Sequence, residues 1–143
     1  MGTGGMDSEK KILVIDDNLF ILNLVKDILR IPNSKLLTTE SGKQGYEIAC
    51  KEHPDVILLD RRLKDQSGYE FLNKLKGNPE TRDIPVTMIS SDDEKRHIEG
   101  SIAHGAEDYI VKPFNINTLR SKVERLIRVG SIHDDRYYYI KRS

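Results

Sequence analysis

The sequence predicts an α/β fold: a doubly wound parallel sheet of five strands, with five helices on its two faces. Five short apolar runs rich in β-branched residues alternate along the chain with five segments of helical periodicity. One run, residues 56–59, is Val-Ile-Leu-Leu without alternation, as in a strand covered on both faces. Right-handed crossovers between parallel strands then place helices on both sides of the sheet.

The first half of the chain contains three expected strands and two helices. Residues 11–16 are an apolar run closed by an aspartate, and the helix that follows has one apolar face: Ile21, Leu24, Val25, Ile28 and Leu29. Pro32 stops this helix. Residues 35–39 form a weaker second strand, and residues 41–52 form a helix closed by His53-Pro54. Residues 55–60 are expected at the centre of the sheet.

The second half repeats the pattern. Ser67-Gly68 opens a helix that ends near Gly77, residues 85–90 are the fourth strand, and residues 93–103 are a helix with Ile98 and Ile102 facing inward. Residues 109–111 are a short fifth strand. The last helix, residues 115–128, is expected to bury five apolar side chains: Ile116, Leu119, Val123, Leu126 and Ile127.

Length and composition exclude several classes of function. A chain of 143 residues is expected to form one domain. Its 23 Lys and Arg balance 23 Asp and Glu, so it lacks the basic excess of a bulk-electrostatic nucleic-acid binder. No apolar run approaches the roughly 18 residues of a membrane span. Cys50 is expected to be a small buried residue, and the four histidines lack zinc-site spacing. We therefore expect a cytoplasmic protein without direct contacts to nucleic acid or membranes.

The domain is expected to span residues 10–129. Residues 1–9 are interpreted as a disordered head of cloning origin, because the first five are small and without periodicity. Residues 130–143 are too few for an effector domain, and we interpret them as a C-terminal tail or a truncated linker. The alternative is that Tyr137, Tyr138 and Tyr139 form an aromatic contact for a partner or a second chain.

Polar side chains stand at the carboxyl ends of the expected strands, where ligands bind in folds of this class. They are Asp16 and Asp17, Thr39 and Glu40, Asp60, Ser90 and Ser91, and Lys112. Two carboxylates about 4 Å apart repel each other by about 4 kcal/mol at an effective dielectric constant near 20. A cluster of these acids therefore requires a cation.

Magnesium suits such a cluster because it prefers carboxylate, water and phosphate oxygens. The site is then suited to phosphoryl transfer, in which a carboxylate accepts the group as an aspartyl phosphate. Asp60 is the candidate nucleophile, since it is single and central, while the adjacent Asp16 and Asp17 are candidate metal ligands. Ser90 and Lys112 are candidates to contact phosphoryl oxygens.

Each of these residues also has a local structural explanation. Asp16-Asp17 and Ser90-Ser91 can cap the helices that follow them, and Lys112-Pro113 can form a turn. Asp60 can pair with Arg61 or Arg62. Their convergence from four separate parts of the chain favours a shared site over four independent caps and turns.

Four motifs give the sequence a family resemblance. They are Ile-Asp-Asp-Asn at 15–18, Ile-Leu-Leu-Asp at 57–60 with Gly68 eight residues after Asp60, Met-Ile-Ser-Ser at 88–91, and Gly-Ala-Glu-Asp-Tyr-Ile-Val-Lys-Pro-Phe at 105–114. With these motifs, residues 10–129 resemble the receiver domain of two-component response regulators. The resemblance implies a flavodoxin-like fold of the receiver type and a phosphoacceptor signalling switch. Such a switch catalyses only its own phosphorylation and dephosphorylation, so it is not an enzyme acting on external substrates.

The resemblance also implies individual roles in the site. Asp60 would accept a phosphoryl group from a sensor histidine kinase or a histidine phosphotransfer protein of a phosphorelay. Mg²⁺ would be held by Asp16, Asp17, Asp60 and the backbone carbonyl of Arg62. Lys112 would contact the phosphoryl group, and its bond to Pro113 would be cis.

A conformational switch follows from the same resemblance. Ser90 would be the hydroxyl that moves toward the phosphoryl group, and Tyr109 the aromatic residue that swings inward with it. Phosphorylation would shift a two-state equilibrium that is read out on the face formed by residues 93–103, 109–111 and 115–128. The same face would mediate a homodimer.

The sequence departs from the family pattern near the expected phosphoacceptor. Leu63 and Lys64 stand where methionine and proline are common, so the loop after Asp60 is expected to be less constrained. Ser90 and Ser91 stand where threonine and alanine are commoner. The family positions two residues beyond Asp60 and Ser90, here Arg62 and Asp92, influence hydrolysis of the phosphoryl group. Our hypothesis is that Arg62 lies over the site with Asp92 as its partner.

Other classes of protein share parts of this pattern. A magnesium-dependent phosphatase of the haloacid-dehalogenase type also uses an aspartyl nucleophile, but its Asp-x-Asp motif follows the first strand, where this chain has adjacent Asp16 and Asp17. A flavin-binding module would need a Gly/Ser/Thr-rich phosphate loop at that point. A pseudo-receiver, which is used only for protein contacts, would lack some of the acidic, hydroxyl and lysine residues found at the strand ends of this chain. A receiver domain excised from a larger regulator or hybrid kinase is a further alternative.

Overall fold

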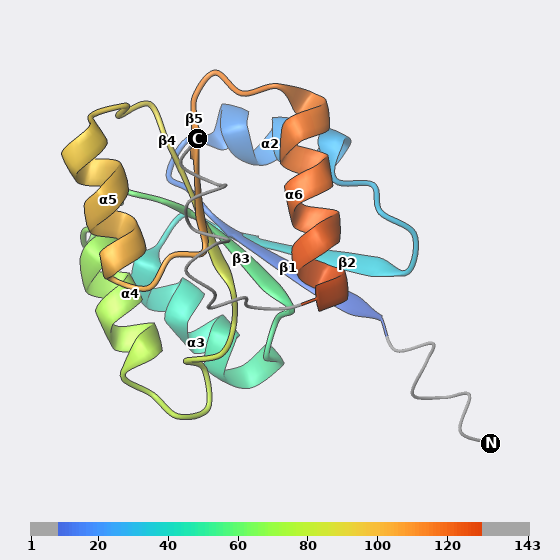
Figure 1. Cartoon of the computed structure of the whole chain (residues 1–143). Coiled ribbons are helices and arrows are strands. Elements are labelled where there is room, and N and C mark those ends of the chain that lie inside the picture. The colour runs from blue at the N-terminus through green and yellow to red at the C-terminus, as the bar shows by residue number, and fades with distance from the viewer. Residues whose placement is uncertain (1–8, 130–143) are drawn as a thin grey trace.

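The computed structural model describes residues 9–129, in which five strands alternate with five helices (Figure 1). The strands are β1 (Lys10–Ile15), β2 (Ser34–Thr39), β3 (Val56–Asp60), β4 (Val86–Ser90) and β5 (Asp108–Val111). The helices are α2 (Leu19–Ile28), α3 (Gly42–Glu52), α4 (Gly68–Lys76), α5 (Lys95–Ala103) and α6 (Ile116–Val129). The strands are all parallel, in the order β2-β1-β3-β4-β5, which confirms the predicted fold class.

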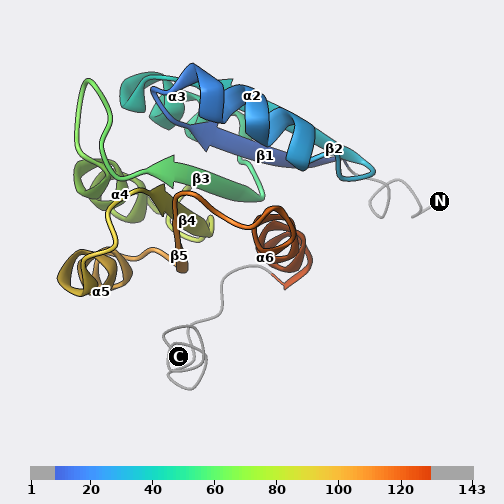
Figure 2. The same cartoon turned by 90° about the horizontal axis from the view of Figure 1, so that it is seen from above.

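The sheet is covered on both faces (Figure 2). Helices α2 and α6 pack on one face and α3, α4 and α5 on the other. Alternation along β1 divides its side chains between the layers, with Ile12 and Val14 in one core and Leu13 and Ile15 in the other. Strand β3 contributes four fully buried residues, as its unbroken apolar run predicts.

Polar residues that follow the strands fix the starts of most helices. The side chain of Asn18 accepts hydrogen bonds from the first turn of α2, and Ser41 and Ser67 do the same for α3 and α4. Helix α5 has no side-chain cap, and Ser101 is its only fully buried residue. Of the four helices whose caps the structure describes, α5 is therefore the one least fixed by its own contacts.

Three apolar assignments differ from expectation. Ile116, expected in the core, is 54% exposed, because it is the first residue of α6 and its side chain points toward the helix N-terminus, away from the sheet. Ile98 and Cys50 are only half-buried, whereas Ile102 is partly buried and packs against the core, as expected. The other four apolar residues expected on α6 face the core, with Ile127 at its edge.

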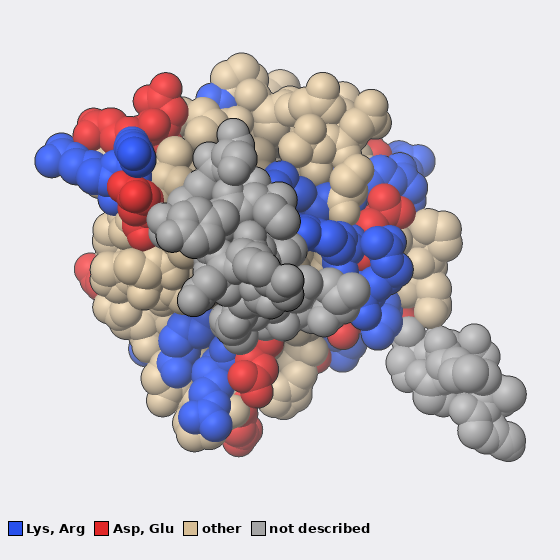
Figure 3. Space-filling model, in the orientation of Figure 1, with Lys and Arg blue, Asp and Glu red and all other residues tan. Residues whose placement is uncertain are grey.

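Charges of both signs are spread over the surface (Figure 3). In this view Lys and Arg side chains gather along α6. Around the start of α5, both basic and acidic side chains lie together. Among residues 9–129, none of the helices has both the length and the apolar character needed to cross a membrane. Residues 1–8 of the expected head at 1–9, and the tail with Tyr137, Tyr138 and Tyr139, lie outside the described residues.

Candidate functional site

The carboxyl ends of four strands converge on one pocket. Asp17 lies after β1, Asp60 ends β3, Ser90 ends β4, and Lys112 follows β5. The pocket is lined by these four residues together with Arg62, Ser91, Asp92, Asp93 and Glu94. Of the strand-end residues predicted from sequence, Thr39 and Glu40 do not line the pocket, because β2 is the edge strand farthest from β4, and Asp16 does not line it because its side chain is buried beneath.

Three carboxylates meet at the centre of the site. Asp16, Asp17 and Asp60 each offer an oxygen within 4.8 Å of the others, and Asp16 is only 2% exposed. Lys112 Nζ donates to Asp16 Oδ2 at 2.9 Å and to Asp60 Oδ2 at 3.4 Å. One ammonium for three carboxylates leaves an excess of negative charge, which a divalent cation can offset.

The carboxyl group of Asp60 has a raised pKa. Burial raises it from 3.8 to about 6, and the negative charge of Asp16 adds to the effect. The backbone N–H of Arg62, 3.1 Å from Asp60 Oδ1, and the Lys112 ammonium act in the opposite direction. At neutral pH the group is therefore largely ionised and able to act as a nucleophile.

Gly68 allows α4 to begin directly against the end of β3. Its N–H donates to the carbonyl of Arg61 at 2.6 Å. A Cβ at this position would lie 2.9 Å from Arg61 Cα and 3.0 Å from the carbonyl oxygen of Asp60, both of them backbone atoms that cannot move aside. The spacing of Gly68 from Asp60, found in the sequence, thus has a packing reason at the site.

The loop after Asp60 is held by Asp65, a residue to which the sequence pattern gave no role. The Asp65 carboxylate accepts hydrogen bonds from the N–H groups of Gly42 and Lys43, at 2.9 and 3.0 Å, and from the Ser41 hydroxyl at 3.1 Å. These backbone hydrogen bonds lower the pKa of Asp65. The loop is therefore tied to the start of α3, although Lys64 replaces the expected proline.

Both residues expected to form the switch contact Asp92. The Ser90 hydroxyl accepts a hydrogen bond from the N–H of Asp92 at 3.1 Å, and the Tyr109 hydroxyl donates to the carbonyl of Asp92 at 2.6 Å. Burial raises the pKa of Tyr109, so its hydroxyl remains a donor at neutral pH. The β4–α5 loop is therefore in direct contact with both side chains.

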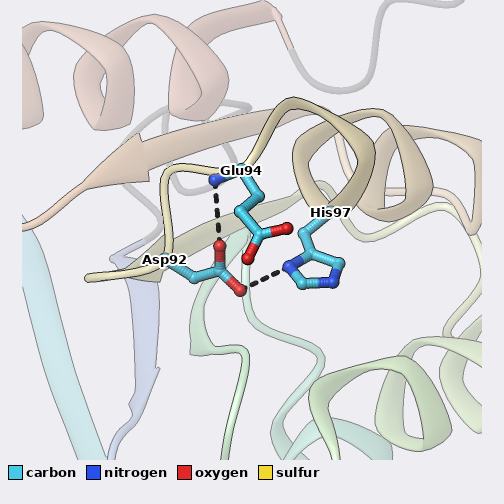
Figure 4. Close-up of side chains that lie close together, drawn as sticks. All are labelled: Asp92, Glu94 and His97. Atoms are coloured by element: carbon cyan, nitrogen blue, oxygen red, sulfur yellow. Dashed lines mark hydrogen bonds and ion pairs between the residues drawn. The ribbon is translucent and has the colours of Figure 1, made fainter.

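The Asp92 side chain is bound mainly by Arg61, which the sequence offered only as a partner for Asp60. Arg61 Nη2 donates to Asp92 Oδ2, whereas Arg62 Nη2 lies 4.0 Å from the same oxygen and the Arg62 side chain is 75% exposed. Arg62 does line the pocket, as hypothesised, but it is the weaker partner. His97 also contacts Asp92, and the N–H of Glu94 donates to Asp92 Oδ1 at 2.9 Å (Figure 4).

Comparison with known proteins identifies the family. Residues 12–124 match the model of the response regulator receiver domain. The chain belongs to this family. The receiver domain is 31% identical over 127 residues to the transcriptional regulatory protein KdpE of Staphylococcus aureus, covering 89% of this chain and 54% of that protein. Its identity to the chemotaxis protein CheY homolog of Campylobacter jejuni is 28% over 123 residues, covering 85% and 95%.

A solved structure shows the same architecture. The chemotaxis response regulator CheY4 of Vibrio cholerae superimposes with a TM-score of 0.76 at 26% identity, covering 83% of this chain and 99% of that one. The chain thus spans about half the length of KdpE and nearly the whole length of the two chemotaxis proteins. The bond between Lys112 and Pro113 is cis, as the family resemblance implied.

Proposed function

We propose that this receiver domain accepts a phosphoryl group on Asp60 and works as the switch of a two-component phosphorelay. The observation that carries the proposal is the convergence of Asp60 with Asp16, Asp17 and Lys112 in one cluster at the carboxyl edge of the sheet. The donor would be a phosphohistidine on a sensor histidine kinase or a histidine phosphotransfer protein. The receiver domain is then a regulatory phosphoacceptor, and not an enzyme with turnover on external substrates.

The acidic cluster fits magnesium. Its donor atoms are carboxylate oxygens, which suit a hard divalent cation, and the excess negative charge around Asp16 favours one. We propose Asp16, Asp17, Asp60 and the backbone carbonyl of Arg62 as the groups that hold it, directly or through water. When bound, the cation neutralises charge on the transferred phosphoryl oxygens.

The residues of the pocket would divide the transfer among them. A carboxylate oxygen of Asp60 forms the new P–O bond as the P–N bond of the donor breaks, and the donor imidazole leaves with the electron pair. Lys112, already 3.4 Å from Asp60, is placed to contact a phosphoryl oxygen. The N–H of Arg62 holds the second oxygen of Asp60 in position.

The switch would run through Asp92. Movement of the Ser90 hydroxyl toward a phosphoryl oxygen breaks its bond from the N–H of Asp92, and this frees the loop that the Tyr109 hydroxyl also contacts. Helix α5, which lacks a side-chain cap and buries little, is suited to move with that loop. We propose the face formed by α5, β5 and α6 as the output surface, and the same face as the site of a homodimer. We also propose that the protein is cytoplasmic.

Two architectures are compatible with this function. KdpE extends well beyond the receiver domain, as does the PhoB protein of Pseudomonas aeruginosa, of which the chain covers 52%. The chemotaxis relative, by contrast, is almost fully covered. The function proposed for the pocket is the same in a single-domain regulator and in a receiver that belongs to a larger protein.

The test is phosphorylation by a small donor. Incubation with acetyl phosphate and MgCl₂ should add the mass of one phosphoryl group to the wild-type chain and none to Asp60→Asn. The matched control is Asp27→Asn, an exposed carboxylate on α2 that should leave the mass gain unchanged. Equal gain in Asp60→Asn, or no gain in the wild type, would contradict the proposal.

A further inference from the structure

The pocket is lined by more carboxylates than cations, and this excess of negative charge opposes the binding of a phosphoryl group. Besides Asp17 and Asp60 the lining includes Asp92, Asp93 and Glu94, against only Arg62 and Lys112 as cations. The aspartyl phosphate at Asp60 carries a charge of about −2 at neutral pH, in place of the single negative charge of the free carboxylate. Asp92 is the critical member, because its side chain is 10% exposed and its backbone N–H contacts the switch hydroxyl of Ser90. Its charge is poorly screened by solvent and would repel the incoming group.

Arg61 supplies the compensating charge from outside the pocket. Its guanidinium donates to Asp92 Oδ2, and its side chain is 12% exposed, yet Arg61 does not line the cavity. Its Cζ lies 5.9 Å from the ring centroid of Tyr69, a cation–π contact that fixes it against α4. Arg61 is therefore a largely buried cation that follows Asp60 directly in the chain and binds the Asp92 carboxylate without lining the pocket.

The remaining neighbours of Asp92 strengthen the same arrangement. The N–H of Glu94 lowers the pKa of Asp92 most, followed by His97 and Arg61, so the carboxylate stays charged at neutral pH. Asp92, Glu94 and His97 lie close enough to hold a metal ion (Figure 4), but Asp92 Oδ2 already accepts from Arg61, which would repel a second cation. The cluster is thus an ion-pair network and not a metal site.

We propose that Arg61 is a positioning residue for phosphoryl acceptance: it neutralises Asp92 and holds that carboxylate away from the phosphoryl group on Asp60. This inference rests on the proposed function. Because Arg61 bridges the loop after β3 to the loop before α5, it also connects the phosphoacceptor to the segment that contacts Ser90 and Tyr109. If Asp92 is replaced by a neutral residue, a cation at position 61 is no longer needed for phosphoryl acceptance.

The test is a double-mutant cycle read by binding of beryllofluoride, a phosphoryl mimic, and by the rate of phosphorylation with acetyl phosphate, both in MgCl₂. Arg61→Gln should weaken beryllofluoride binding and slow phosphorylation about tenfold, through the uncompensated charge of Asp92. Adding Asp92→Asn should restore both to within about twofold of wild type, because the repelling charge is gone. Arg61→Lys should stay within about threefold, since it keeps the charge. Arg30→Gln, which removes an exposed cation paired with Asp27 away from the pocket lining, is the matched control and should change neither quantity.

The outcomes separate this inference from the proposed function. If the wild type is not phosphorylated on Asp60, the function itself is wrong. If the wild type is phosphorylated and Arg61→Gln behaves like it, or the double variant is as impaired as Arg61→Gln, the inference alone is overturned. Should Arg61→Gln fail to fold, the single variant Asp92→Asn decides: it should bind beryllofluoride at least as tightly as wild type, and weaker binding overturns the inference.

Discussion

Lys112 donates to Asp16 at 2.9 Å across 96 positions of sequence, and this ammonium lies closer to Asp16 than to the proposed phosphoacceptor. Asp16 is almost completely buried and Lys112 is 17% exposed, so the pair is poorly screened by solvent. In the free pocket Lys112 therefore does two things: it compensates a buried charge, and it stays within reach of Asp60.

Removing this ammonium should destabilise the fold in a metal-dependent way. Lys112→Met leaves Asp16 buried without its cation, and we expect the free energy of unfolding in EDTA to fall by about 2–3 kcal/mol. In MgCl₂ the loss should be smaller, because the same carboxylates then bind a divalent cation. Urea denaturation in both conditions measures the difference. Lys26→Met, an exposed lysine on α2, is the control, and an equal loss for Lys112→Met in EDTA and in MgCl₂ would argue against a cation at this cluster.

The raised pKa of Asp60 predicts a pH-dependent gain of stability when the charge is removed. The folded-state value is about 6 and the ordinary value 3.8, so the folded protein binds the proton more readily than the unfolded chain. The negative charge of Asp60 therefore destabilises the folded protein. This destabilisation is fully present above pH 6 and disappears as the pH falls from 6 to about 4. In metal-free buffer, Asp60→Asn should raise the free energy of unfolding by about 1–2 kcal/mol at pH 7.5, less than the full shift implies because residual solvent screens the site.

The measurement is urea denaturation of wild type and Asp60→Asn at pH 7.5 and pH 4, with Asp27→Asn as the exposed control. The gain should vanish at pH 4. A gain of the same size at both values would show that it comes from packing of the amide and not from the charge of Asp60.

The close approach of Gly68 to the end of β3 predicts that a methyl group there disturbs both fold and function. In Gly68→Ala the new Cβ meets backbone atoms of Asp60 and Arg61, so the loop must shift, and we expect a loss of about 1–3 kcal/mol. The displaced Asp60 should also be phosphorylated more slowly by acetyl phosphate. In Gly100→Ala of α5, by comparison, the new Cβ would meet side-chain atoms of Tyr69 and no backbone atom, so we expect a smaller loss of stability than in Gly68→Ala. Equal stability of Gly68→Ala and wild type would contradict this account.

Sequence patterns predicted the parts of the fold that depend on local periodicity. The unbroken apolar run of β3 marked a central strand, and parallel strands necessarily bring Asp17, Asp60, Ser90 and Lys112 to one edge. The pairing of Asp92 could not be predicted in this way. Arg61 and Arg62 are identical neighbours in sequence, and only the path of the loop decides which side chain turns inward.

Ile116 was misplaced for a related reason. Its spacing from Leu119 and Val123 continues the apolar face of α6, but periodicity carries no information on where the underlying sheet ends. Asp65 was missed because its partners lie more than twenty residues away, at the start of α3. A lone aspartate in a polar loop gives no signal of such a contact.

The contact of Asp65 with α3 predicts that this one side chain restrains the loop after the phosphoacceptor. Asp65→Ala removes an acceptor from two N–H groups of the first turn of α3, while the Ser41 cap on Gln44 remains, so we expect a loss of about 1 kcal/mol at pH 7. The pKa of Asp65 is lowered in the folded state, so its contribution is present above the ordinary value near 4 and is lost as the pH falls below it. The free energies of unfolding of wild type and Asp65→Ala, measured by urea denaturation, should therefore converge as the pH falls progressively below that value. Asp65→Asn keeps one acceptor oxygen, so it should retain part of the stability at pH 7. In hydrogen exchange, the N–H groups of Gly42 and Lys43 should exchange no faster in Asp65→Asn than in Asp65→Ala. A stability difference that persists unchanged at low pH would mean that the carboxylate charge has no part in holding the loop to α3.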